Sequence, residues 1–128
     1  MDKLLSAVEN PKELIKLDSF DGSNFTRWKD KMIFLLTALK IFYVLDPSLP
    51  APPEPTPEDT DATKAERKKR EEDELLCRGH ILNTLTDRLY DLYSNLKSPR
   101  EIWTALQTAY ENEKRERVEW FSHAVLGV

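Results

Sequence analysis

A stripe of apolar residues at helical spacing constrains this chain most strongly. Gly22 supplies a turn, and Ser23 or Asn24 can accept a hydrogen bond from the free N–H groups of a helix that follows. We expect this helix to run from about Asn24 to Leu39 or Val44. Its apolar residues recur at steps of three and four, so they share one face that must be buried. They are Phe25, Trp28, Met32, Leu35, Leu36 and Leu39.

Length and charge favour one soluble domain. The 128 residues and 40% hydrophobic content suffice for a modest core. A net charge of -4 lacks the basic surplus of a nucleic-acid-binding module, so we expect no direct nucleic-acid binding. The single cysteine excludes an internal disulfide, and we find neither a signal peptide nor a membrane span. We therefore expect a cytoplasmic protein, with the nucleus as the alternative, and no membrane association.

A proline cluster divides the chain. Six of the eight prolines lie within residues 47–57, where apolar residues that could pack are scarce. Residues 46–60 are therefore expected to form an exposed, extended loop. Its simplest role is a spacer between helices, which we favour over a ligand for a proline-binding domain. Thr60 or Asp61 then offers a cap for a second, longer helix.

The second helix begins with a charged run. Residues 67–70 read Arg-Lys-Lys-Arg, which resembles a basic nucleic-acid motif, but four acidic residues follow at once. Opposite charges three and four residues apart favour a salt-bridged, solvent-facing surface. Gly79 lies inside this helix, where it marks either close approach by another helix or a bend.

Two further helices follow the charged run. The apolar spacing of Ile81, Leu85 and Leu89 continues into a short helix that Thr86 can cap. Ser98 then precedes a proline and, three positions on, Glu101, so the two side chains can each satisfy a backbone N–H at a helix start. The face of this last helix carries Ile102, Trp103, Leu106 and Tyr110.

The residues support no catalytic or cofactor site. Cys77 and His80 could share a helix face, but a zinc cage needs more ligands, and a partly buried cysteine beside an exposed histidine is the simpler interpretation. No glycine-rich phosphate loop is present. Trp28 and Trp103 lie on apolar stripes, which indicates core packing and not base stacking. Trp120 lies outside a regular stripe and, with Phe121, is a candidate interface residue.

Two motifs in a fixed order resemble a known family. The first is Phe20-x-Gly22-x-Asn24-Phe25-x-x-Trp28-x-x-x-Met32, and the second is Ser98-x-x-Glu101-Ile102-Trp103-x-x-Leu106-x-x-x-Tyr110. Together with the proline-rich break and the charged helix leading to Ile81 and Leu85, they resemble the Gag polyprotein of copia-type LTR retrotransposons. The resemblance implies an all-α, capsid-like bundle of about four to six helices that multimerises and has no catalysis of its own.

The resemblance also sets the expected organisation. It covers about residues 17–113, preceded by an amino-terminal arm at 1–16 and followed by a charged helical extension at 114–128. The family's zinc knuckle, which contacts RNA, is built on several cysteines. This sequence has one cysteine and so has no counterpart of the knuckle. We therefore expect a structural domain that associates with itself. The alternatives are a host adaptor derived from Gag that binds a protein partner and, less favoured, a helical nucleic-acid-binding module.

Overall fold

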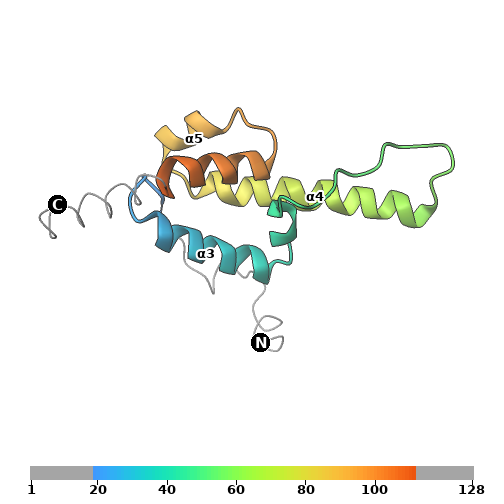
Figure 1. Ribbon diagram of the computed structural model, residues 1–128, viewed down its shortest axis with the longest axis horizontal. Helices are drawn as coiled ribbons and strands as arrows, with labels where there is room; N and C mark the ends of the chain where they lie inside the picture. The colour runs from blue at the N-terminus through green and yellow to red at the C-terminus, as the bar shows by residue number, and fades with distance from the viewer. Residues whose placement is uncertain (1–18, 112–128) are drawn as a thin grey trace, which may run out of the picture.

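The computed structural model describes residues 19–111, which form only helices, turns and loops (Figure 1). In chain order these are α3 (Phe25–Ala38), the 3₁₀ helix η1 (Phe42–Leu45), α4 (Asp61–Asn83) and α5 (Asp87–Tyr93). Residues 99–111 are also helical. The predicted all-α fold is confirmed. The arm at 1–16 and the whole extension at 114–128, which includes Trp120 and Phe121, lie outside the described residues.

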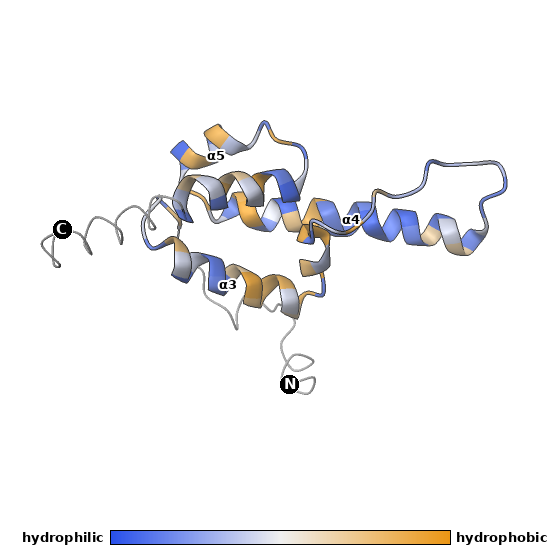
Figure 2. Cartoon of the chain, in the orientation of Figure 1, coloured by the Kyte–Doolittle hydropathy of each residue, from blue (hydrophilic) through white to orange (hydrophobic). Residues whose placement is uncertain are grey.

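The core lies where α3, α4 and the helical residues 99–111 face one another (Figure 1). Figure 2 shows hydrophobic residues gathered on the second half of α3, whereas the first half of α4 is largely hydrophilic. Leu39 and Tyr110 are partly buried against the core. The fully packed residues are Phe20, Phe25, Trp28, Met32, Leu35, Leu36, Ile41, Val44, Leu45, Cys77, Ile81, Leu82, Leu85, Leu89, Ile102, Trp103 and Leu106.

Phe20 ties the start of the described chain to the turn between α4 and α5. Its backbone N–H donates to the Thr84 carbonyl oxygen at 2.7 Å, and its carbonyl oxygen accepts from Thr86 N–H at 3.0 Å. This pairing is an isolated parallel bridge between Phe20 and Leu85, both of which are buried. The bridge satisfies backbone groups that would otherwise be buried without partners.

The start of α3 corrects our prediction of a side-chain cap. Asn24 is the N-cap residue, but it adopts a left-handed conformation (φ 55°) and its side chain makes no capping hydrogen bond. Ser23 precedes the N-cap position, and its hydroxyl and its N–H both donate to Asp21 Oδ1, at 2.6 and 2.9 Å, so it belongs to the turn before the helix. Such a local bond between an aspartate side chain and a nearby backbone N–H is an alternative to a helix cap.

We predicted that α3 ends at Leu39 or at Val44, and the structure has the earlier end, with Leu39 as the C-cap residue. Lys40 is left-handed (φ 63°), its N–H donates to the Thr37 carbonyl, and Ile41 N–H donates to the Leu36 carbonyl. These two bonds form a Schellman motif, in which glycine is the usual left-handed residue. A lysine gives no such signal in the sequence. The chain then turns into η1, whose Val44 and Leu45 are buried.

The exposed loop predicted for residues 46–60 is present, and a cap follows it. These residues contain turns but no helix or strand, and all but Leu49 and Asp59 are exposed. Thr60 is the N-cap of α4, and its hydroxyl accepts from Thr63 N–H at 3.1 Å. This hydrogen bond confirms Thr60 as the capping residue.

Gly79 does not mark a close helix contact. A Cβ built on it would meet no atom within 4 Å, so no neighbouring helix requires the glycine there. Its backbone is part of the regular α4 helix and has no positive φ. The prediction of close approach is therefore wrong, because the residue lies on the side of α4 that faces away from the core.

Gly79→Ala should stabilise the protein by up to about 1 kcal/mol. Alanine is the better helix former by roughly that amount, and the substitution reduces the freedom of the unfolded chain without a clash. Thermal unfolding followed by circular dichroism should show a raised melting temperature. A lowered melting temperature would mean that the open space beside Gly79 is occupied in solution.

The last two helices are held by one cap and one arginine. The Ser98 hydroxyl accepts from Arg100 N–H at 3.2 Å, as predicted for a capping serine. The return bond predicted from Glu101 is not formed within residues 19–111, and this carboxylate is exposed. Thr86 is the N-cap of α5 but makes no side-chain capping bond. Arg78 instead secures the end of α5, since it donates to the carbonyl oxygens of Ser94 and Leu96 at 2.7 and 3.1 Å.

Candidate interaction surfaces

The aromatic residues of the two motifs form one buried cluster. The Trp28 ring stacks on Phe20 with centroids 5.0 Å apart and lies 5.7 Å from the Trp103 ring. The Tyr110 ring meets the Phe20 ring edge-on, with centroids 5.1 Å apart, and stacks on the Phe25 ring at 6.0 Å. The Trp28 Nε1–H donates to Thr84 Oγ1 at 3.0 Å, which satisfies its polar group in the interior. Because Trp28 and Trp103 are buried, neither offers a stacking platform for nucleic-acid bases.

The basic run on α4 makes ion pairs, as its sequence indicated. Lys69 Nζ lies 2.6 Å from Asp73 Oδ2, and Arg70 Nε lies 3.3 Å from Glu74 Oε1, each pair one helical turn apart. Arg67 departs from the pattern, because its Nη2 pairs with Asp59 in the proline-rich loop at 2.9 Å. These pairs account for most of the basic run and support the interpretation of a salt-bridged face.

Two arginines of α4 hold the proline-rich loop against the helix. Arg67 Nε donates to the Pro53 carbonyl oxygen at 3.2 Å, and Arg70 Nη1 donates to the Pro50 carbonyl oxygen at 3.1 Å. Our sequence analysis missed this contact. The available signal was the excess of carbonyl acceptors in a segment whose prolines have no N–H, followed by arginines three residues apart.

Asp73 is the one buried charged residue of the described chain and links η1 to α4. Its Oδ2 accepts from Tyr43 Oη at 2.5 Å and from Lys69 Nζ, and the Lys69 ammonium lies 5.4 Å from the Tyr43 ring centroid. Burial raises the pKa of Asp73, but the hydrogen bonds from Lys69 and Tyr43 outweigh it and hold the pKa below its ordinary value. Burial and the Asp73 hydrogen bond raise the pKa of Tyr43.

Asp73→Ala should lower the free energy of unfolding at neutral pH by about 1 kcal/mol, since most of the carboxylate's hydrogen bonding is to partly exposed partners. The native pKa of Asp73 is depressed, so its contribution is complete above the unfolded value of about 3.9 and is lost as the pH falls through the native pKa. Urea unfolding of both proteins at several pH values should therefore show curves that converge in acid. The exposed Glu71→Gln is the control and should leave the pH dependence unchanged. A pH-independent difference would contradict the assignment.

Several large apolar side chains remain outside the core. On α4, Leu75 and Leu76 are 68% and 53% exposed, and on α3 Phe34 is 66% exposed. Leu92 of α5 is also exposed. Leu75 lies on the side of α4 opposite the buried Cys77, whereas Leu76 lies between the two sides. Neighbouring exposed leucines of this kind are a feature of contact surfaces.

The described residues do not bring together the groups of a metal site. Within residues 19–111, no three His, Cys, Asp or Glu side chains are grouped so that they could hold a metal ion. Burial and the charge of Glu74 raise the pKa of the Cys77 thiol to about 12, so it is protonated at neutral pH. His80 is partly buried, not exposed as expected. No helix among these residues has the length and apolar character needed to cross a membrane.

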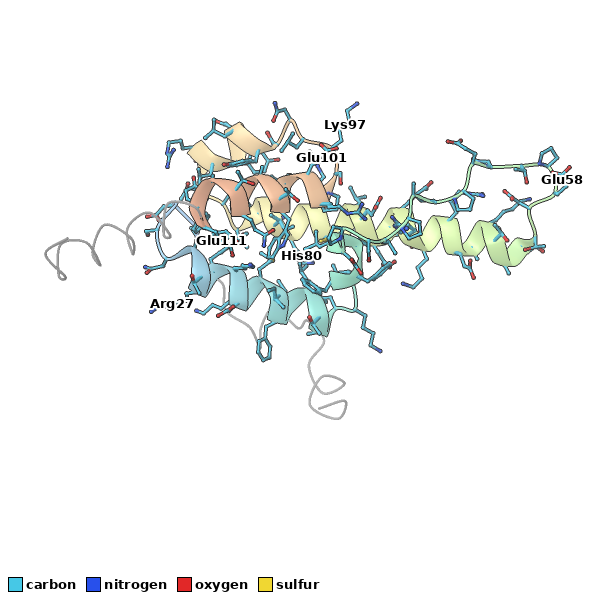
Figure 3. The ribbon with its side chains drawn as sticks, viewed as in Figure 1. Arg27, Glu58, His80, Lys97, Glu101 and Glu111 are labelled. Atoms are coloured by element: carbon cyan, nitrogen blue, oxygen red, sulfur yellow. The ribbon has the colours of Figure 1, made fainter. Side chains whose placement is uncertain are left out.

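A small hollow lies beside the start of α3. Its volume is about 130 Å³, and its charged lining residues are Asp21, Arg27 and Lys31. Hydrogen bonds from the Ser23 hydroxyl and N–H lower the pKa of Asp21, so this carboxylate is ionised at neutral pH. Figure 3 shows Arg27 at the edge of the molecule, away from His80. The mixture of charges gives the hollow no clear preference for an anion or a cation.

These features define a small all-α domain organised around a shared aromatic core. A scan against protein families matches residues 32–124 to the gag-polypeptide of LTR copia-type. The chain therefore belongs to the copia-type Gag family. The match begins at Met32, the last residue of the first motif, and continues to residue 124, past the limit of about 113 that the motifs suggested. Searches of curated proteins and of solved structures each found no match.

Proposed function

We propose that this chain is a non-catalytic structural domain that associates with copies of itself through helix–helix contacts. Membership of the copia-type Gag family supports a Gag-related structural role. The observation that carries self-association is the pair of exposed leucines, Leu75 and Leu76, on an α4 helix whose opposite side is packed in the core. Burial of such side chains between copies would remove apolar surface from water.

The proposed contacts are individually weak. Each leucine pair covers little area, and the charged residues around it limit the gain from burial. A lattice of many such contacts is nevertheless stable, because each additional contact within an assembly is made at a high effective concentration. This is the mechanism by which the domain would serve as a shell component in the cytoplasm.

Sedimentation velocity of the purified chain over a concentration series tests self-association. The expected result is a sedimentation coefficient that rises with protein concentration, with reversible dimers or larger species. A strict monomer at every concentration would overturn the proposal. Circular dichroism of the same samples verifies that the helical fold is present.

A second candidate is a host adaptor that keeps the Gag fold and binds a different protein. The observation that favours it is the proline-rich loop, because every residue from Leu49 to Pro57 is a proline or precedes one. Such residues favour the extended polyproline conformation that aromatic grooves of SH3 and WW domains recognise. A monomeric chain that binds SH3 or WW domains through this loop would support the adaptor role. Direct nucleic-acid binding is not expected, since the net charge is -4.

A further inference from the structure

We infer that a second copy of this chain packs antiparallel along the outer side of α4. The contact is made by a set of residues that we call the α4 stripe. Its members are Asp61, Ala65, Lys68, Glu72, Leu75 and Gly79. This inference rests on the proposed self-association and adds the surface, the orientation and the charge pairing.

The α4 stripe is one continuous helix face. Its members follow one another at steps of three and four residues, which keeps them on one side of an α-helix. All are exposed except Gly79, which is partly covered, and a Cβ added to Gly79 would still meet no atom within 4 Å. The buried residues Asp73, Cys77 and Ile81 lie on the other side of α4, and the buried Leu82 lies just beyond the last member of the stripe. The stripe is therefore exposed from Asp61 to Leu75 and partly covered at Gly79.

The stripe complements itself when one copy is reversed. Lys68 and Glu72 lie two residues on either side of Arg70, and Ala65 and Leu75 lie five residues on either side. In an antiparallel pair centred on Arg70, each Lys68 would face the partner's Glu72. Each Leu75 would face the partner's Ala65. The pairing thus has two ion pairs at the centre and an apolar contact beyond each.

The charges at the centre are free to make these pairs. Within residues 19–111 neither Lys68 nor Glu72 forms an ion pair, whereas the adjacent Lys69 and Arg70 are paired with Asp73 and Glu74. Lys68 precedes Glu72 by four residues, the less favourable order for an ion pair within one helix. A partner's charges are therefore the better match for both side chains.

The shape of the molecule leaves room for the partner. The first half of α4 extends beyond the other helices, accompanied only by the proline-rich loop (Figure 1). The loop is held by Arg67 and Arg70, which lie off the α4 stripe. A reversed copy could therefore lay its own α4 along the projecting half, with the two bundles at opposite ends of the pair.

Charge reversal in two separate chains tests the pairing. Lys68→Glu and Glu72→Lys should each weaken self-association about tenfold, because two attractions become two repulsions. A mixture of the two variants should regain association, since every 68–72 contact between unlike chains is then attractive. Lys97→Glu is the matched control, because Lys97 is exposed and belongs to the segment after α5, not to α4 (Figure 3). Analytical ultracentrifugation with one chain fluorescently labelled measures each case.

The results separate this inference from the proposed function. Recovery in the mixture supports the α4 pairing, because effects confined to one helix would persist on mixing. Self-association of the natural chain that is indifferent to both substitutions would overturn the α4 pairing and leave the proposed function standing. Weakening without recovery on mixing would overturn the antiparallel register. A strictly monomeric natural chain would overturn both. Melting temperatures close to that of the natural chain show that the variants fold.

Discussion

Trp28→Ala should reduce the free energy of unfolding by about 3–5 kcal/mol, as expected for removal of a buried indole. Trp28 is 5% exposed, stacks on Phe20, contacts Trp103 and donates to Thr84. The substitution would therefore leave a cavity at the centre of the aromatic cluster and remove one of the two hydrogen bonds of the Thr84 hydroxyl, which still donates to the Ile81 carbonyl oxygen. A domain of this size has a total stability of about 5–15 kcal/mol, so much of it would be lost. We expect a large fall in the melting temperature, and a similar fall for Trp103→Ala.

Two further variants separate the contribution of Trp28 packing from that of its hydrogen bond to Thr84. Trp28→Phe retains an aromatic ring but loses the bond to Thr84, and should cost less than Trp28→Ala. Phe34→Ala is the matched control, because it removes an aromatic ring from the same helix at a position that is 66% exposed. Its effect should lie within about 0.5 kcal/mol of zero. If Trp28→Ala melted near the natural protein, Trp28 would have to be reassigned from the core to an interaction surface.

Gly22→Ala should destabilise the fold by about 2 kcal/mol. Gly22 has φ 106°, which L-amino acids with a Cβ rarely adopt, and such strain costs about 1–3 kcal/mol. The added Cβ would also lie 3.2 Å from Tyr110 Cε1, so the ring would have to shift from its contacts with Phe20 and Phe25. Urea unfolding should show a lower midpoint with an unchanged slope.

Gly79→Ala is the matched comparison for this change. Both variants add one methyl group to a glycine, but Gly79 has ordinary helical geometry and open space, so the expected effects have opposite signs. Gly22→Ala combined with Tyr110→Leu tests the cause of the destabilisation. A double variant no less stable than Tyr110→Leu alone would show that the Tyr110 contact, and not the backbone conformation, makes Gly22 necessary.

Periodicity in the sequence accounts for much of the fold. The three- and four-residue spacing of Phe25, Trp28 and Met32 predicted α3, and these side chains lie in the core. The Ser98 cap and the exposed proline-rich loop also follow from local chemistry. Such features depend on neighbouring residues alone, so the sequence displays them directly.

Other features give no clear signal in the sequence. The left-handed Lys40 ends α3 without glycine, and the left-handed Asn24 precedes this helix without a side-chain capping bond. The clamp of Arg67 on the loop joins residues 14 positions apart. A helical projection places Leu75 opposite Cys77. Only the structure shows that the Cys77 side of α4 faces the core, and that Leu75 is therefore exposed.

The clamp on the proline-rich loop has a consequence for the behaviour of the protein in acid. Prolines donate no hydrogen bonds, so Arg67 and Arg70 hold the loop through its carbonyl oxygens, and a backbone carbonyl needs no ionised form to accept these bonds. Protonation of Asp73 releases its ties to Lys69 and Tyr43, and protonation of Asp59 breaks the ion pair with Arg67. The two carbonyl bonds persist, so acidification should loosen η1 from α4 while the loop remains fastened to the helix.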